Sequence, residues 1–189
     1  MQHGGVGFRH MMTLDEFQIL CEQRRSIRYF SDQPLKKEEV ESLLRLAVLS
    51  PNIENTQPWH FHIIFDQALR TKLMEASCYG NFVEGAAALI VVSSEKSVLP
   101  ASKQILWNPR ELEYSCASAM QNILLGATAI NLGSCWVSLQ HGKAAEILHI
   151  PREQVIVGGI MLGHYKKGEE QSSDGHMRVA LDDVCEWHE

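Results

Sequence analysis

The sequence lacks the cysteine pattern of a disulfide framework or a zinc site. Its five cysteines are odd in number and widely spaced, and no two of them form a C-x-x-C pair. It also contains no G-x-G-x-x-G fingerprint and no P-loop, so a nicotinamide donor would have no Rossmann site of its own. A reducing cytosol fits this cysteine usage best, and we expect a cytoplasmic protein.

Long apolar runs and an excess of positive charge are also missing. The longest apolar stretches, 86–92 and 155–163, are far shorter than the roughly 20 residues of a membrane-spanning helix. Residues 1–12 hold no apolar segment of a secretory signal. The net charge of −6 argues against a general nucleic-acid binder. We expect neither a membrane nor a nucleic-acid partner.

The 189 residues, with 45% hydrophobic and 21% charged, suit one ordinary globular domain. We expect a flexible tail at 1–12 and a single domain over 13–189. Apolar periodicity predicts helices that alternate with strands, which indicates a mixed α and β class. The expected helices run from Leu14 toward Arg24 and over 36–49, 67–76, 112–130 and 143–148, and the strands over 59–65, 86–92, 134–139 and 154–163.

A basic cluster, Arg24-Arg25-Ser26-Ile27-Arg28, follows the first expected helix. Guanidinium groups bind phosphate with paired N–H donors, and the hydroxyl of a neighbouring serine adds a further hydrogen-bond donor. Such a cluster in an acidic chain favours an anion site. Taken alone, however, such a cluster is more typical of a solvated basic turn.

A second polar stretch runs over 51–59 and carries the amides of Asn52, Asn55 and Gln57. An amide both donates and accepts hydrogen bonds, which suits the edge of a flat heterocycle. Asparagine and proline also favour turns, so this stretch alone could equally be a turn between a helix and a strand.

The two stretches together, in this order, resemble the FMN-dependent nitroreductase family. Three later segments fit the same resemblance: Gln121-Asn122-Ile123-Leu124-Leu125, Leu132-Gly133-Ser134-Cys135-Trp136 and Val157 to Tyr165. The likeness covers 13–184. It implies an α+β nitroreductase-like fold, with a central mixed, mostly antiparallel sheet flanked by helices, in an intertwined homodimer whose 165–189 segment docks on the partner subunit.

The resemblance also implies which residues hold FMN. Arg24 and Ser26 match the phosphate-binding positions, with Arg178 closing on the phosphate, and Arg28 matches the cation near the pyrimidine edge of the flavin; Arg25 lies beside it. Pro51, Asn52, Ile53 and Asn55, with Gln57, match a loop that reaches the flavin from the other subunit. Trp136, Val137 and Ser138 match a strand end against the ring. No metal is implied.

The implied activity is oxidation of NAD(P)H and reduction of a small acceptor such as a nitro compound or quinone. Flavin N5 carries the chemistry in turn for both substrates, which predicts ping-pong kinetics and no indispensable acid or base side chain. Two alternatives stay open. The chain could be a flavin-binding protein with little turnover, acting as a store, sensor or partner, or a related flavin enzyme with dehalogenase or dehydrogenase chemistry.

The chain departs from the family pattern in three places. It has Asn52-Ile53-Glu54 where relatives commonly have small residues, it has no lysine in the ring-side segment 78–85, and its excursion over 95–109, a candidate lid, is short. Tyr79, Asn81 or Phe82 could take the place of the lysine.

Other candidate residues carry weaker signals. His60 and His62 lie two apart on an expected strand and could share a metal, although a structural role is the more common outcome. Cys116 and Cys135 lie in apolar stretches that suit inert buried thiols.

Overall fold

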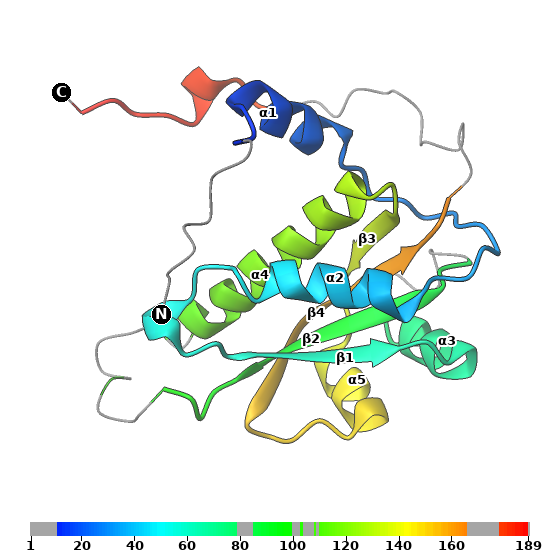
Figure 1. Ribbon diagram of the computed structural model, residues 1–189. Coiled ribbons are helices and arrows are strands. Elements are labelled where there is room, and N and C mark those ends of the chain that lie inside the picture. Colours follow the sequence, from blue (N-terminus) through cyan, green and yellow to red (C-terminus); the bar gives the residue numbers. More distant parts are fainter. Residues whose placement is uncertain are drawn as a thin grey trace, which may run out of the picture.

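The computed structural model describes residues 11–78, 85–99, 103, 108, 110–165 and 178–188. Helices alternate with strands, which confirms the mixed class (Figure 1). The helices are α1 (Leu14–Gln23), α2 (Lys37–Ala47), α3 (Gln67–Glu75), α4 (Arg110–Ala129) and α5 (His141–Leu148), with short 3-10 helices η1 (Ile53–Asn55) and η2 (Leu181–Asp183). The strands are β1 (Trp59–Ile64), β2 (Ala88–Glu95), β3 (Gly133–Val137) and β4 (Gln154–Gly163).

The strands form one sheet in the order β1-β2-β4-β3, and each neighbouring pair is antiparallel. At the centre, Ile90 of β2 pairs with Ile63 of β1 and with Ile160 of β4. A parallel bridge between Ser26 and Ser134 adds the segment after α1 to the β3 edge. The expectation of a mostly antiparallel sheet flanked by helices is confirmed.

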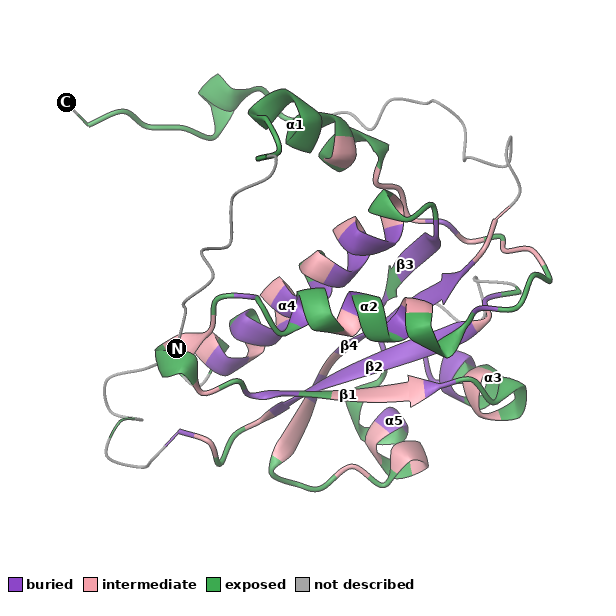
Figure 2. Cartoon of the chain, in the orientation of Figure 1, coloured by how far each residue is buried: buried purple, intermediate pink, exposed green. Residues whose placement is uncertain are grey.

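Both faces of the sheet are covered, which explains the continuous apolar run in β2. Ile90 and Val92 point toward α2 and α4 and join one buried cluster, whereas Leu89 and Val91 point toward α3 and α5 and join a second (Figure 2). Side chains alternate between the faces of a strand, so one β2 strand serves both cores.

Helix α4 is the central helix that the sequence predicts. It packs against α2 on one side and against the sheet on the other. Gly126 lies where α4 contacts α2. A Cβ at this position would lie 2.6 Å from Leu46 Cδ1 and 3.0 Å from Leu43 Cδ2. The missing side chain therefore lets α2 and α4 approach each other closely.

Several predicted boundaries were off by two or three residues, and two of them have a clear physical cause. Strand β2 continues to Glu95 instead of ending at Val92, because Ser93 and Ser94 are buried and stay paired with β1 and β4. Strand β3 ends at Val137 instead of Leu139, because Leu139 leaves the sheet and forms an antiparallel bridge with Ser77. Polar residues inside a buried strand hide its end from a hydropathy pattern.

Helix α1 and the C-terminal segment lie on the outside of the domain. Thr13 caps α1 through a capping box with Glu16, yet none of the residues of α1 is buried. The described residues 178–188 are all exposed, including Trp187 at 85% (Figure 2). Within the described parts of the chain, no helix has the length and apolar character needed to cross a membrane.

Candidate functional site

The basic cluster lies along the β3 edge of the sheet. Helix α1 ends when Arg24 turns to an extended backbone, with φ −61° and ψ 125°. Ile27 N then donates to Ser134 O at 2.9 Å, and the Ile27 side chain is buried. Because side chains alternate along an extended chain, anchoring Ile27 inward turns Ser26 and Arg28 away from the core.

The positive charges of Arg24 and Arg28 both act on Cys135 of β3. Burial raises the pKa of the Cys135 thiol, while the positive charges of Arg28 and Arg24 act in the opposite direction. Both guanidinium groups therefore lie near this strand, and both residues are partly exposed. Among the described residues, no carboxylate forms an ion pair with Arg24. Its charge is available to a ligand.

Arg25 has a different role from its neighbours. Its Nη1 atom donates to Arg24 O at 3.0 Å and to Glu22 O, so the guanidinium closes the carbonyl end of α1. Arg28 Nη1 lies 3.4 Å from Ser26 O. The cluster thus divides into a helix-capping arginine, Arg25, and two arginines whose charges act on Cys135 of β3.

The predicted strand end places Trp136 and Ser138 at the surface. Trp136 is 36% exposed, and its indole lies over Gly158, where a Cβ would come within 2.8 Å of Trp136 Nε1. Val137 faces the opposite side and is fully buried. A ligand at this strand could therefore meet the side chains of Trp136 and Ser138, whereas Val137 offers its backbone.

The amide-rich loop 50–57 is fastened to α4 by side chains. Asn122 Nδ2 donates to Ser50 Oγ at 2.8 Å and to Leu46 O at 3.1 Å. Ser115 Oγ accepts from Ile53 N at 3.2 Å. Inside the loop, Asn52 Oδ1 accepts from Gln57 N at 2.8 Å. These bonds give a polar segment a defined shape, with Pro51, Asn55 and Gln57 exposed.

The same loop has an unusual backbone. Glu54, Asn55 and Gln57 have φ values of 45°, 55° and 50°, in the left-handed region that L-residues seldom adopt. The Glu54 carboxylate forms an ion pair with Lys103. Its negative charge is therefore balanced within the chain.

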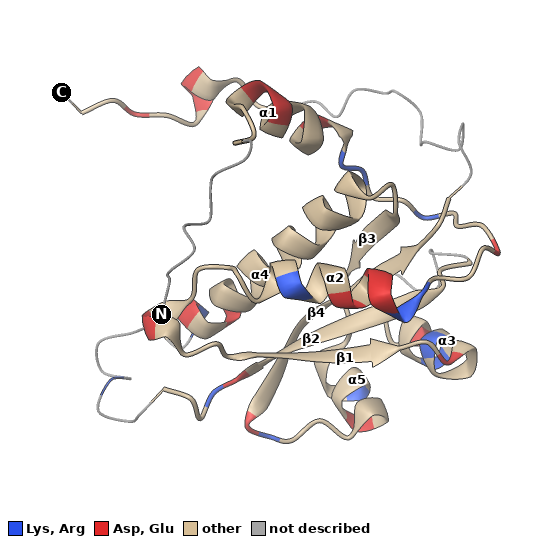
Figure 3. Ribbon diagram, viewed as in Figure 1, with Lys and Arg blue, Asp and Glu red and all other residues tan. Residues whose placement is uncertain are grey.

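One chain does not bring the two predicted parts of the site together. The basic cluster lies beside β3, just after the end of α4, whereas loop 50–57 is fastened to Ser115 near the start of this helix and to Asn122 in its middle (Figures 1 and 3). The 14 residues from Ser115 to Ala129 span about 21 Å of helix. The two halves thus lie far apart within one copy of the chain.

Some residues that the sequence placed in the site have no contact with it or lie outside the described residues. Arg178 is exposed and makes no hydrogen bond or ion pair with the rest of the described chain. Tyr79, Asn81 and Phe82, the candidates for the ring-side position, lie outside the described residues. So do most of the 95–109 excursion and most of the 1–12 tail.

The remaining candidates have roles inside the fold. His62 Nε2 lies 3.0 Å from Ser93 Oγ, which donates to Gln154 Oε1 at 2.8 Å. Burial, and secondarily the nearby His60, lowers the pKa of His62. Burial raises the pKa of Cys116 to about 12, and Cys135 is buried with a raised pKa. The prediction that both are inert buried thiols is confirmed.

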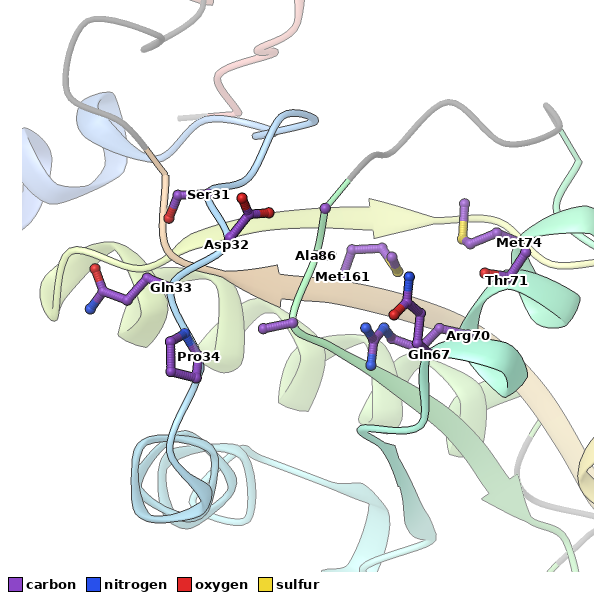
Figure 4. Close-up of a pocket in the computed structure, with 12 residues that line it drawn as sticks. Ser31, Asp32, Gln33, Pro34, Gln67, Arg70, Thr71, Met74, Ala86 and Met161 are labelled. Carbon is purple, nitrogen blue, oxygen red and sulfur yellow. The ribbon is translucent and has the colours of Figure 1, made fainter.

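A hollow of about 420 Å³ was missed at the sequence level (Figure 4). It lies between the 31–34 segment and α3, with Ala86 and Met161 at its base. Gln67, Arg70 and Thr71 line one wall, and their i, i+3, i+4 spacing on α3 was the signal that could have placed them on a shared face. None of the predicted ligand-binding residues lines this hollow.

Comparison with known proteins shows the family of this chain. The sequence model of the Nitroreductase family matches residues 21–164. The chain belongs to the nitroreductase family. The matched segment includes the basic cluster, loop 50–57 and β3, but not Arg178.

Individual members of the nitroreductase family are similar over nearly the whole chain. A protein of Archaeoglobus fulgidus, provisionally named NADH dehydrogenase/NAD(P)H nitroreductase, is 34% identical over 85% of this chain and 91% of its own. A crystal structure from Desulfovibrio desulfuricans, of a provisionally named nitroreductase in complex with FMN, superposes with a TM-score of 0.76 and 26% identity, covering 91% of this chain and 96% of the other. A provisionally named nitroreductase from Bacillus subtilis has a TM-score of 0.80, 20% identity and coverage of 93% and 100%, which shows the shared fold.

Proposed function

We propose that this chain is an FMN-dependent oxidoreductase that takes hydride from NAD(P)H and reduces a small acceptor, such as a nitro compound or a quinone. One observation carries the proposal: the basic cluster pairs with β3 through the Ser26–Ser134 bridge and the Ile27 N to Ser134 O hydrogen bond, on the strand that presents a partly exposed Trp136. The FMN complex of the Desulfovibrio desulfuricans relative and the name of the Archaeoglobus fulgidus relative support the cofactor and the electron donor.

The donor set suits FMN. A phosphate needs fixed positive charge and hydroxyl or amide donors, which Arg24 and Ser26 supply at the end of α1, with Arg178 from the C-terminal segment. A flat ring needs an apolar surface with amide groups at its edge. Trp136 supplies the first, and Asn52, Asn55 and Gln57 supply the second.

The site is completed by a second copy of the chain. Because the basic cluster and loop 50–57 lie at opposite ends of α4, the loop of one subunit serves the basic cluster of its partner. Exposed apolar side chains provide surface for this homodimer, and exposed patches of this kind mark interfaces. They are Leu14, Phe17 and Ile19 on α1, and Val179, Leu181, Val184 and Trp187 in the C-terminal segment, which we propose docks on the partner.

The residues of the chain would bind, orient and tune, and bound FMN would supply the hydride and electron transfer. Arg28 places a fixed positive charge near the ring, which favours the extra negative charge that reduction brings. Cys135 keeps its proton because burial raises its pKa, so it is not a nucleophile beside the ring. A single face shared by donor and acceptor gives ping-pong kinetics.

The first test is the chromophore. The purified protein is expected to be yellow and to release FMN at one molecule per chain, identified by chromatography and mass spectrometry. Riboflavin is the matched control: it lacks the phosphate that Arg24 and Ser26 would bind, so its affinity should be far lower. Equal binding of FMN and riboflavin would contradict the phosphate site, and no binding of either would overturn the proposed function.

The second test is turnover. NADH or NADPH, added without oxygen, should bleach the bound flavin rapidly, and steady-state plots with varied donor and acceptor should run parallel. Slow bleaching would favour a flavin store or sensor over an enzyme. Intersecting plots would contradict a single shared face.

A further inference from the structure

Loop 50–57 is held in shape by hydrogen bonds within its own chain. Glu54, Asn55 and Gln57 all adopt left-handed backbone conformations, although none of them is glycine. Such residues persist where surrounding contacts fix them, and they gather at functional sites. The contacts that fix this loop therefore bear on what the loop does.

Two side chains of α4 carry these contacts. Ser115 and Asn122 are seven residues apart, so they lie on the same face of the helix, two turns from each other. Asn122 donates to Ser50 Oγ at the start of the loop and to Leu46 O in the last turn of α2, whereas Ser115 accepts from Ile53 N in the middle of the loop. Ser115 Oγ also donates to Glu111 O at 2.8 Å, which leaves its lone pairs facing the loop.

We propose that Asn122 and Ser115 are positioning residues that hold loop 50–57 in the conformation in which it meets the FMN of the partner subunit. This inference rests on the proposed dimeric FMN function. It further states that each of these side chains affects FMN binding at the site of the partner chain and not at the site of its own chain. A preformed loop loses little conformational freedom on binding, so the affinity for FMN is higher.

The single-site experiment compares three variants in FMN titrations of the full-length apoprotein. Asn122→Ala and Ser115→Ala each remove the side-chain contacts and are expected to weaken FMN binding by about tenfold. Thr128→Val is the matched control, because the Thr128 hydroxyl bonds to Leu124 O of its own helix and to no part of the loop. FMN affinity unchanged in both loop variants would overturn the proposal.

A mixed dimer separates positioning from a general loss of structure. Differently tagged Arg24→Ala and Asn122→Ala chains are co-expressed, and the heterodimer is isolated by two affinity steps. One of its sites then combines both lesions. The other combines the intact Arg24 of the Asn122→Ala chain with the intact loop of the Arg24→Ala chain.

The number of sites with wild-type affinity gives the answer. Action on the partner predicts one such FMN site per heterodimer, although each parent homodimer has none. Action within the same chain, or through a weakened fold, leaves both sites damaged and predicts none, which would overturn the positioning role while wild-type FMN binding still supported the proposed function. A wild-type protein that bound no FMN would overturn both.

Discussion

The basic cluster and loop 50–57, which lie near opposite ends of helix α4, differ in the groups that they offer to a ligand. Near the C-terminal end of α4, the basic cluster runs in ordinary extended backbone along β3 and contributes charge. Toward the N-terminal end of α4, loop 50–57 contributes neutral amides, has three left-handed residues, and has its one acid paired with Lys103. Charge acts over a distance and tolerates loose geometry, whereas amides need a fixed direction. The strain is therefore found where direction matters.

The largest effect is expected at the basic end. Arg24→Ala should raise the FMN dissociation constant by roughly thirtyfold, because a charge-assisted bond to phosphate contributes about 2 kcal/mol. Fluorescence titration of the apoprotein measures this. Arg152→Ala, an exposed arginine in the turn before β4, is the matched control and should leave the affinity unchanged. Equal effects of the two substitutions would remove Arg24 from the site.

A smaller effect is expected at the amide end. Asn55→Gly keeps the left-handed backbone accessible but removes the amide, and should weaken FMN binding by about tenfold. Asn55→Ala should weaken it further, because alanine is strained at φ 55°. His149→Gly changes another left-handed residue, at the end of α5, and serves as the control. A harmless Asn55→Gly would show that the loop contributes shape alone.

Away from both ends of the site, His62 is expected to make the stability of the fold depend on pH. Burial lowers the pKa of His62 in the folded chain, so below about pH 6.5 the unfolded chain binds the proton first. This contribution to stability is complete above pH 6.5 and is lost as pH falls toward the lowered pKa. Urea unfolding at pH 7.5 and pH 5 should show a smaller acid loss in His62→Gln than in wild type. Equal losses would assign the pH dependence to other groups.

The smallest effect is expected from the ion pair in the loop. Lys103→Ala should change FMN affinity by less than about threefold, because partly exposed ion pairs contribute little and salt screens them. Any difference from wild type should shrink between 50 mM and 500 mM NaCl. A large, salt-independent effect would indicate that Lys103 itself contacts the ligand.

The sequence predicted those parts of the fold that follow a local rule. The helix expected from Leu14 begins there, after the capping residue Thr13, and the strand expected over 86–92 contains the buried apolar run from Ala88 to Val92. The continuation of β2 through Ser93 was missed because its hydroxyl is satisfied by Gln154 and His62, which lie on other strands. Long-range polar pairing of this kind leaves no periodic signal.

The sequence was enough to predict which residue types form the candidate site, but not how their side chains are oriented. The spacing of the arginines marked an anion site, yet the assignment of Arg25 to the end of α1 depends on its rotamer. The burial of Val137 depends on which face of β3 meets α5. The hollow beside Arg70 joins α3 to a segment more than thirty residues away, and no local pattern connects the two.

Gly126 also bears on how the protein responds to heat and denaturant. By letting α2 and α4 touch, it joins the helix that leads into loop 50–57 to the helix that carries Ser115 and Asn122. Both attachments of the loop thus belong to one tightly packed pair of helices. An exposed polar loop usually opens in local fluctuations, but this one should open together with the core. The amide hydrogen of Ile53 should therefore exchange with solvent as slowly as those of the helices that support it.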